Sequence, residues 1–287
     1  MVAVERINQY TRIENEAPQT TDYDERVTMK WPSEGKIDFI SVMMRYRPKL
    51  PLVLKGLDLS VPAQSKVGVV GRTGAGKSTI AMALLRIVEI DSGSIVIDGV
   101  DIRELGLSRL RNSIAVIPQD PILFSGSIRT NLDPFNSYED DPLIRVLEKV
   151  GLCRFGESGE SFGAIGALSD VVLEDGSNFS VGQKQLLVIA RALLHEATIV
   201  IMDEATAAVD AETDQRLQII MRTEFKNATC ITIAHRLNTI MDSDYILCMD
   251  DGRAAEFDTP SKLMSAGGLF KDLVDAWEEE NASSMSM

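Results

Sequence analysis

The chain has 287 residues, of which 45% are hydrophobic and 25% are charged. This balance is typical of a soluble globular protein with a substantial core, and the length exceeds that of one minimal domain. The formal net charge of −14 argues against a nucleic-acid surface, because neutralising phosphates requires clustered lysines and arginines.

The cysteines, histidines and apolar runs exclude several further classes of protein. Cys153, Cys230 and Cys248 are odd in number and lack metal-ligand spacing, which favours a reducing compartment over a disulfide framework. Two histidines are too few for a His-rich metal site. The N-terminus has no basic segment followed by an apolar one, so we expect no signal peptide. No run approaches the roughly 18 apolar residues of a membrane span, so we expect no transmembrane helix in this chain.

The first third of the chain changes character at about residue 36. Residues 1–36 are polar and irregular, and we interpret them as a linker with a short helix at about 2–10. Alternating apolar and polar residues predict strands in 36–46 and 52–61. The next elements expected are a buried strand at 66–71, a helix at 77–88, and a turn and strand within 91–102.

The sequence pattern from residue 120 onward predicts an insertion followed by alternating helices and strands. Residues 120–178 combine helical patches with Gly-rich and Ser-rich loops, so we expect a mostly helical insertion. The alternation after it favours a mainly parallel sheet with helices on both faces. The elements expected there are a helix at 181–194, a strand at 198–202, a helix at 212–225 and strands at 229–233 and 245–249. Residues 278–287 are typical of a disordered tail.

The sequence GRTGAGKST, residues 71–79, carries phosphate-binding chemistry. It matches the pattern G-x-x-x-x-G-K-[ST], between an apolar strand and an apolar helix. Glycines let the backbone wrap around an oxyanion, whose charge the exposed N–H groups and the helix dipole stabilise. We expect Lys77 to act in catalysis by reaching the β- and γ-phosphates, and Ser78 to ligate Mg²⁺. The residues expected to bind the nucleotide here are Gly71, Arg72, Thr73, Gly74, Ala75, Gly76, Lys77, Ser78 and Thr79.

Two acidic residues end the apolar run TIVIMDEA, residues 198–205. In a parallel sheet the carboxyl ends of the strands carry the ligand site. We expect Asp203 to hold Mg²⁺ through water and Glu204 to polarise the attacking water. A helix start after a core strand also favours acidic residues, and this alternative would explain the pair if it stood alone.

Gln119 and His235 follow two further apolar runs. Gln119 comes after IAVIP and before an Asp-Pro break, and its amide can contact both Mg²⁺ and the attacking water. His235 follows TCITIA, where a neutral imidazole can hydrogen-bond a γ-phosphate or a water; a structural histidine is the alternative. His195 ends a helical run, where the helix dipole alone explains it.

A phosphate loop does not hold a base, so the adenine requires a second feature. Tyr46, before the second predicted strand, is the candidate platform, since stacking of a base on an aromatic ring contributes about 1–3 kcal/mol. An ordinary half-buried strand tyrosine is the alternative interpretation.

Residues 179–183, FSVGQ, begin the helix predicted at 181–194. Ser180 suits a helix N-cap, and Gly182 permits close approach of another molecule. In order along residues 36–277, the motifs resemble those of the nucleotide-binding domain of ABC transporters. These motifs are Tyr46, GRTGAGKST, Gln119, FSVGQ, IVIMDE, AAVD (207–210) and His235.

The resemblance implies a fold, a domain organisation and cofactors. The implied fold is α/β, a P-loop NTPase of the ABC ATPase type, with a mainly parallel central sheet, an antiparallel β subdomain and an inserted helical subdomain. The implied cassette covers 37–277, with the helical subdomain at about 120–190. Residues 1–36 would be a linker that follows a transmembrane domain absent from this chain, and 278–287 a disordered tail. ATP and Mg²⁺ are the implied cofactors.

The resemblance also implies a head-to-tail dimer in which FSVGQ serves the ATP of a second nucleotide-binding domain. FSVGQ differs from the family's usual LSGGQ at Phe179 and Val181, and the Val181 side chain should restrict the turn that meets the γ-phosphate. The residues expected to act in trans are Ser180, Val181, Gly182, Gln183 and Asp210.

The same departures resemble the second nucleotide-binding domain of subfamily C, the multidrug-resistance-associated transporters, and so do NLDPF (131–135) and AAVD. There the two ATP sites are unequal. The implication is that this chain builds the hydrolytic site, completed by a non-identical first cassette, while FSVGQ completes the weaker one. The members of the hydrolytic site would be Lys77, Asp203, Glu204 and His235, with Gln119 beside them.

The function implied is a motor domain that couples ATP hydrolysis to export of solutes. Its transmembrane domains would lie upstream or in another chain, and residues 1–18 are similar to the segment that leaves the last membrane helix in subfamily C. This places the cassette at the cytoplasmic face of a membrane. One alternative is a nucleotide-gated cassette of a channel or channel regulator, since subfamily C contains both. A non-transport ABC ATPase acting on ribosomes or DNA is disfavoured by the acidic charge.

Overall fold

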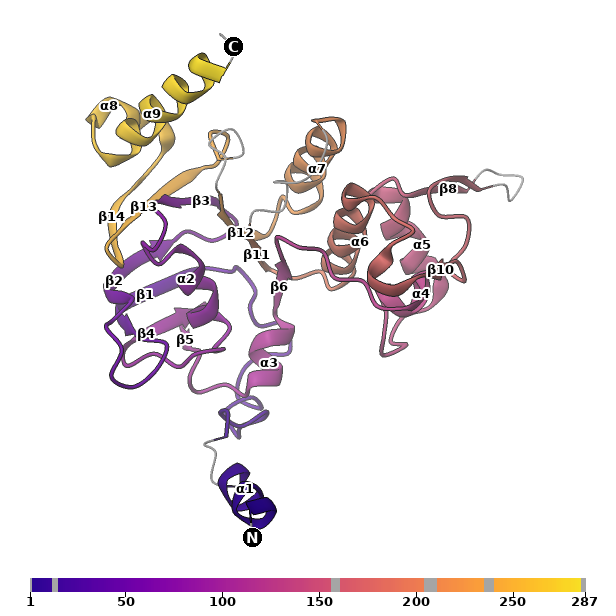
Figure 1. Cartoon of the computed structure of the whole chain (residues 1–287), viewed down its shortest axis with the longest axis horizontal. Helices are drawn as coiled ribbons and strands as arrows, with labels where there is room; N and C mark the ends of the chain where they lie inside the picture. The colour runs from indigo at the N-terminus through magenta and orange to yellow at the C-terminus, as the bar shows by residue number, and fades with distance from the viewer. Residues whose placement is uncertain (1, 12–14, 156–160, 204–210, 235–239, 285–287) are drawn as a thin grey trace.

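The computed structural model describes residues 2–11, 15–155, 161–203, 211–234 and 240–284 (Figure 1). The helices are α1 (Val2–Tyr10), α2 (Lys77–Leu84), α3 (Leu107–Asn112), α4 (Ile128–Leu132), α5 (Asp140–Lys149), α6 (Val181–Leu194), α7 (Ala211–Glu224), α8 (Pro260–Ala266) and α9 (Leu269–Ser284), with a 3₁₀ turn at Glu174–Gly176. The strands are β1 (Ile37–Met44), β2 (Leu54–Val61), β3 (Lys66–Gly71), β4 (Ser92–Ile97), β5 (Val100–Asp101), β6 (Ile114–Ile117), β7 (Gly126–Ser127), β8 (Cys153–Phe155), β9 (Ser161–Gly163), β10 (Val171–Val172), β11 (Ile199–Asp203), β12 (Thr229–Ile233), β13 (Tyr245–Asp250) and β14 (Arg253–Asp258).

Six strands form the central sheet in the order β14-β13-β3-β12-β11-β6. Strands β13, β3, β12, β11 and β6 run parallel, and β14 pairs antiparallel with β13. The near-continuous apolar runs of β3, β11 and β12 are buried, as expected of parallel strands covered on both faces. The mainly parallel central sheet that the sequence predicts is confirmed.

A second, antiparallel sheet has the order β2-β1-β4-β5. The inward side chains of β1 and β2, such as Phe39 and Leu57, share one apolar cluster with Ile80 and Leu84 of α2. Alternation in the sequence therefore places one face of this sheet against the helix that follows the phosphate loop. The antiparallel β subdomain expected from the sequence is confirmed.

The insertion forms a separate helical lobe around α4, α5 and α6 (Figure 1). Leu143 and Leu147 of α5 and Leu187 of α6 belong to a second apolar cluster, which also contains Ile117 of β6 and Met202 of β11. The lobe therefore packs against the β11–β6 side of the central sheet. Helix α6 spans the residues that the sequence predicts, and the lobe also contains the short strand pairs β7–β10 and β8–β9.

Helix α2 is shorter than the sequence predicts, since it ends at Leu84 rather than near Val88. Arg86 adopts a left-handed backbone conformation with φ of 49°. Its guanidinium is buried and donates through Nη1 to the carbonyls of Ile102 and Leu105, both at 3.0 Å. These long-range hydrogen bonds, which the local pattern does not encode, turn the chain away from the helix.

Residues 15–35 pack closely on the cassette. The Trp31 ring is buried, and its Nε1 donates to the carbonyl of Ile97 at 3.1 Å. The Asp98 carboxylate accepts hydrogen bonds from the backbone N–H groups of residues 33, 34, 35 and 36 at 2.8–3.0 Å. This segment, which the sequence presents as a linker, thus has irregular backbone with specific anchors.

The C-terminal helix extends further than expected. Helix α9 continues to Ser284, so residues 278–284 are helical where the sequence predicts a disordered tail. Phe270 and Val274 bury the start of α9 in a third cluster, which gives the helix a packed base from which it continues. Among the helices of the described residues, none has the length and apolar character needed to cross a bilayer.

Candidate functional site

The phosphate-loop segment joins β3 to α2 and has the backbone that its glycines make possible. Gly71, Gly74 and Gly76 have φ of 147°, 84° and 98°. A Cβ on Gly71 would lie 2.2 Å from the carbonyl oxygen of Met249, so no other residue fits there. The sequence therefore places glycine where the loop requires both a left-handed conformation and close approach of a neighbouring strand.

Lys77 lies inside this loop. Its side chain is 7% exposed, and its Nζ donates to the carbonyls of Gly71 at 2.8 Å and Arg72 at 3.2 Å. Helix α2 begins at Lys77 with no side-chain cap, which leaves N–H groups at its start available to an anion. Residues 72–74 and Ser78 are exposed, so the loop opens to solvent. A buried cation and a helix start together form a site for phosphate oxygens.

The turn between β13 and β14 contacts the phosphate loop, which the sequence does not predict. The N–H of Gly252, in the turn between β13 and β14, donates to the carbonyl of Ala75 at 3.1 Å, and the Gly252 carbonyl accepts from Lys55 N at 3.0 Å. The Lys55 ammonium pairs with the Asp251 carboxylate and lowers its pKa. The Asp-Gly pair between two strands is a hairpin signal that could have located this turn, but not its partner.

Tyr46 lies beside the same helix. Its hydroxyl is 2.9 Å from Oγ1 of Thr79, which is buried in the first turn of α2, while 45% of the tyrosine side chain is exposed. Tyr46 is thus partly exposed while its hydroxyl is held against the first turn of α2. An exposed tyrosine beside the first turn of α2 is compatible with the base platform that the sequence predicts.

Strand order places further predicted residues along one edge of the sheet. Asp203 ends β11 and pairs with Ile233 of the parallel neighbour β12. On the other side, β11 pairs with β6, and Gln119 follows β6 by two residues. Because β3, β12, β11 and β6 are adjacent and parallel, their carboxyl ends meet at the edge that the phosphate loop occupies. Asp203 and Gln119 are therefore brought to the same edge as Lys77.

Three predicted residues, Glu204, Asp210 and His235, lie outside the described residues. Within the described residues there is no group of three or more His, Cys, Asp or Glu side chains able to hold a metal. Ser78, Asp203 and Gln119 offer hydroxyl, carboxylate and amide oxygens, which are the donors Mg²⁺ prefers, and Mg²⁺ characteristically fills its remaining positions with phosphate oxygens and water. The donor set thus fits Mg²⁺ bound together with a nucleotide.

FSVGQ starts α6 with a reciprocal cap. The Ser180 hydroxyl oxygen accepts from the Gln183 N–H at 3.2 Å, and the Gln183 side-chain oxygen accepts from the Ser180 N–H at 2.9 Å. Val181 is the first helical residue, with its side chain 43% exposed, so valine fits the backbone here without strain. The predicted effect of Val181 would therefore come from its exposed side chain rather than from the turn.

The structure does not bring FSVGQ to the phosphate loop of this chain. Figure 1 shows α6 in the helical lobe and α2 in the lobe that holds the antiparallel sheet. Ser180 and Val181 are exposed, and Phe179 packs against the apolar cluster of the helical lobe. The phosphate loop and FSVGQ therefore lie on two different lobes of the chain.

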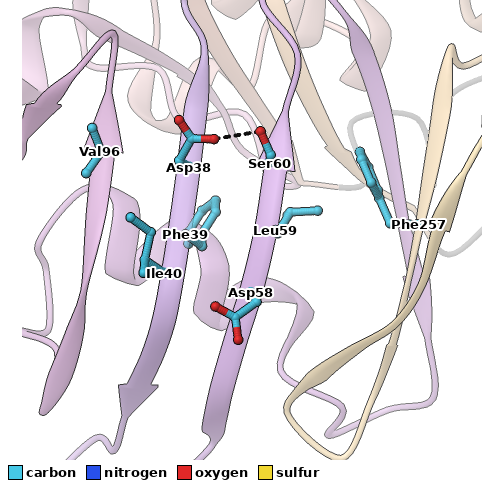
Figure 2. A pocket seen from close by; sticks show the side chains of 8 residues that line it. All are labelled: Asp38, Phe39, Ile40, Asp58, Leu59, Ser60, Val96 and Phe257. Carbon is cyan, nitrogen blue, oxygen red and sulfur yellow. Dashed lines mark hydrogen bonds between the residues drawn. The ribbon is translucent and has the colours of Figure 1, made fainter.

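A separate hollow of about 480 Å³ lies over the antiparallel sheet, away from these segments (Figure 2). Its walls combine apolar side chains with Asp38 and Asp58, and the Asp38 carboxylate accepts from the Ser60 hydroxyl at 2.6 Å. The described residues that line it include none of the predicted site residues. The hollow is therefore not part of the candidate nucleotide site.

Comparison with known proteins identifies relatives of this chain. The family model described as ABC transporter matches residues 54–207. ATP-binding cassette sub-family C member 2 of Homo sapiens is 49% identical over 284 residues, which cover 99% of this chain and 18% of that protein. ABC transporter C family member 12 of Dictyostelium discoideum is 49% identical over 283 residues, 98% of this chain and 21% of that protein.

A solved structure has the same fold. The structure of a bacterial Atm1-family ABC exporter with ATP bound matches with a TM-score of 0.81 and 30% identity, over 96% of this chain and 47% of that chain. The chain thus spans about half of that exporter chain and about a fifth of the curated relatives it matches. The P-loop NTPase fold of the ABC ATPase type, expected from the motifs, is confirmed.

Proposed function

The chain belongs to the ABC transporter family, and we propose that it is the ATP-binding and ATP-hydrolysing cassette of a transporter that exports solutes across a membrane. The observation that carries the proposal is the buried Lys77 ammonium, held by the Gly71 and Arg72 carbonyls inside a loop that opens to solvent. Phosphate oxygens are better partners for an ammonium than neutral carbonyls, so a bound triphosphate draws Lys77 to its β- and γ-phosphates.

The base of the nucleotide stacks on Tyr46, whose ring lies next to the first turn of α2. The Tyr46–Thr79 hydroxyl pair uses one of its two protons, so the second can be donated to a phosphate oxygen. The loop amides and the start of α2 bind the remaining phosphate oxygens. Base and triphosphate are thereby held by adjacent parts of one rigid lobe.

Hydrolysis takes place at the edge where the parallel strands end. Ser78, Gln119 and Asp203 would hold Mg²⁺, which would supply positive charge against the phosphates. Glu204 polarises the attacking water, and His235 contacts the γ-phosphate. Lys77 stabilises the transferring group, so the chemistry is positioning and electrostatic stabilisation rather than covalent catalysis.

The FSVGQ segment and Asp210 serve the ATP bound to a second cassette. Because the Ser180 oxygen accepts the Gln183 N–H, its own O–H proton remains for a phosphate oxygen of the partner's ATP. The exposed Val181 side chain limits how closely that ATP approaches. The two sites are therefore unequal, with the stronger one built on Lys77 and completed by a partner that carries LSGGQ.

We assign the chain to the second cassette position of a subfamily C transporter, at the cytoplasmic face of a membrane. Two features support contact with transmembrane domains upstream or in another chain. Phe124 and Phe135 are 68% and 87% exposed on the helical lobe, and we expect the transmembrane domains to cover them. The loop that carries Gln119 leads directly into Phe124, so motion at the nucleotide reaches this surface.

The test is ATP hydrolysis by the purified chain, alone and mixed with a separate cassette that carries LSGGQ. We expect little activity alone and clear stimulation by the partner. Lys77→Ala or Glu204→Gln in this chain should remove the stimulation. Undiminished turnover in Glu204→Gln would contradict the assignment of the hydrolytic site. Strong activity of the chain alone, rising with protein concentration, would indicate a homodimer, and binding without turnover in any mixture would favour a regulatory cassette.

A further inference from the structure

Helix α6 contains a buried polar side chain that the proposed chemistry does not use. Gln185 is 1% exposed, between the FSVGQ cap and the apolar residues Leu186 and Leu187. Glutamine is seldom buried in an apolar cluster unless both ends of its amide have partners. The position therefore requires an explanation other than packing.

Only one end of the Gln185 amide has a partner within the described part of the chain. Its Nε2 donates to the carbonyl of Pro118 at 3.2 Å, while its Oε1 is buried without any hydrogen bond among the described residues. The two ends cannot be exchanged, because the Pro118 carbonyl accepts and cannot donate. A methionine or leucine would fill the same space without leaving a polar atom unsatisfied, so stability alone does not favour glutamine.

The Pro118 carbonyl stands directly before Gln119, the residue proposed to contact Mg²⁺ and the attacking water. In the segment Pro118–Gln119–Asp120–Pro121 the prolines have no N–H, so the backbone donors that this segment can offer to Oε1 are the amides of Gln119 and Asp120. A small movement of this segment can present one of them to Oε1 while Nε2 keeps the Pro118 carbonyl. The Gln185 amide would then engage the segment at both ends.

A second contact aligns the same loop along α6. The Arg191 guanidinium donates through Nη1 to the Ile122 carbonyl at 2.9 Å and through Nη2 to the Asn131 side-chain oxygen at 2.8 Å. Asn131 in turn donates to the Phe124 carbonyl at 2.7 Å and accepts from the Phe124 N–H at 2.9 Å. Arg191 thus holds the far part of the loop, and Gln185 holds the part next to the nucleotide.

We propose that Gln185 is a positioning residue that links the loop at 71–79 to the FSVGQ segment. Nucleotide at the Lys77 site draws the Gln119 segment into the two-ended contact with Gln185, and this contact fixes the orientation of the α6 start that carries FSVGQ. Occupancy of one ATP site is thereby transmitted to the segment that serves the other. The inference rests on the proposed function, since it requires ATP at the phosphate loop and a role in trans for FSVGQ.

The test is amide hydrogen exchange of the whole chain, with and without ATP and Mg²⁺. The Glu204→Gln background prevents turnover, and the protein concentration is kept where light scattering shows a monomer, so that dimerisation does not protect FSVGQ. Gln185→Met keeps the side-chain volume and removes both polar atoms. Leu186→Met is the matched control at the adjacent buried position. Thermal unfolding of each variant checks the fold, and Gln185→Met is expected to match or exceed the parent.

Three segments report the outcome: 71–79, 119–124 and 179–185. In the parent and in Leu186→Met, ATP should slow exchange in all three, by about fivefold in 179–185, the factor that one net hydrogen bond contributes. In Gln185→Met, protection of 71–79 should remain and that of 179–185 should be lost. Equal protection of 179–185 in both variants would overturn this inference and leave the proposed function standing. Absence of protection at 71–79 in the parent would overturn the proposed function, and the inference with it.

Discussion

The loop at 71–79 and the FSVGQ segment, which we propose both act on phosphates, are built in opposite ways. The loop at 71–79 takes its shape from distant residues, since Met249 limits position 71 to glycine and Gly252 binds the Ala75 carbonyl. FSVGQ takes its shape from itself, through the cap between Ser180 and Gln183. The first segment is supported on several sides before any ligand arrives, whereas the second presents an exposed helix start. The contrast is that the loop at 71–79 depends on distant residues for its backbone shape, whereas the cap that shapes FSVGQ is local.

The largest effect is expected where the loop depends on its buried cation. Lys77→Ala removes the ammonium that the Gly71 and Arg72 carbonyls hold, and that we propose stabilises charge in the transition state. We expect hydrolysis in the presence of the partner cassette to fall by at least about 100-fold. Phosphate release measures it, and Lys262→Ala, which breaks an exposed pair with Asp258, should leave the rate unchanged.

The tertiary support of the loop can be tested by a pair of glycines with nearly the same φ. A Cβ on Gly252, at φ of 77°, would lie 2.0 Å from the Val53 carbonyl oxygen, whereas a Cβ on Gly99, at φ of 82°, would meet nothing within 4 Å. Gly99→Ala should lower stability by about 1 kcal/mol. Gly252→Ala should cost a further 1–3 kcal/mol or so and weaken ATP binding. Denaturant unfolding and nucleotide titration measure the two effects. If Gly252→Ala and Gly99→Ala changed stability and ATP affinity equally, the turn at Gly252 would not support the loop.

Removing the base platform should affect binding more than folding. Tyr46→Ala deletes the ring, and we expect ATP affinity to fall by a factor of about 5–150, equivalent to 1–3 kcal/mol of stacking. Tyr46→Phe keeps the ring and removes only the hydroxyl bonded to Thr79, so the loss should be about fivefold. Calorimetric titration with ATP and with tripolyphosphate separates the contribution of the ring from that of the hydroxyl. Tripolyphosphate has no base, so its binding should not respond to loss of the ring itself.

The FSVGQ segment should respond in trans and not in cis. Val181→Gly removes the exposed side chain, and we expect a few-fold rise in turnover at the partner's site with only a few tenths of a kcal/mol lost from α6. Ser180→Ala should lower that turnover and destabilise the lobe by about 1 kcal/mol through loss of the cap. ATP binding by this chain's own loop should be unchanged in both, and a change there would contradict the division of roles.

The smallest expected effect is a loss of folding stability at alkaline pH, which depends on one buried cysteine in the core of each lobe. Burial raises the pKa of Cys153 in the helical lobe to about 11 and that of Cys248 in the sheet lobe to about 12, from 9.0 when free. The unfolded chain therefore loses these protons first, so stability should be constant below about pH 9 and fall as pH rises toward 11. Unfolding midpoints across this range test it. Cys153→Ala and Cys248→Ala should each flatten the decline, and an unchanged slope would exclude the thiols as its cause.

Much of the fold and of the candidate site is predictable from sequence because the informative patterns are local. The phosphate loop, the cap of α6 and the buried strands are written in consecutive residues, and each carries its own backbone preference. Helix α6 was accordingly predicted with its observed bounds. The family followed from the order of such motifs, none of which depends on how the chain is folded in space.

Tertiary structure alone decided which distant segments meet. The strand order places β13 beside β3, which brings Met249 and Gly252 to the phosphate loop about 175 residues away in the sequence. Tertiary contacts also shorten α2 through Arg86, hold Trp31 against the Ile97 carbonyl of the antiparallel sheet, and set Gln185 against Pro118. Such contacts are a few hydrogen bonds or a close steric approach between segments whose own sequences do not indicate the partner. The sequence by itself therefore determined the motifs, and only the packed chain determined how they are connected.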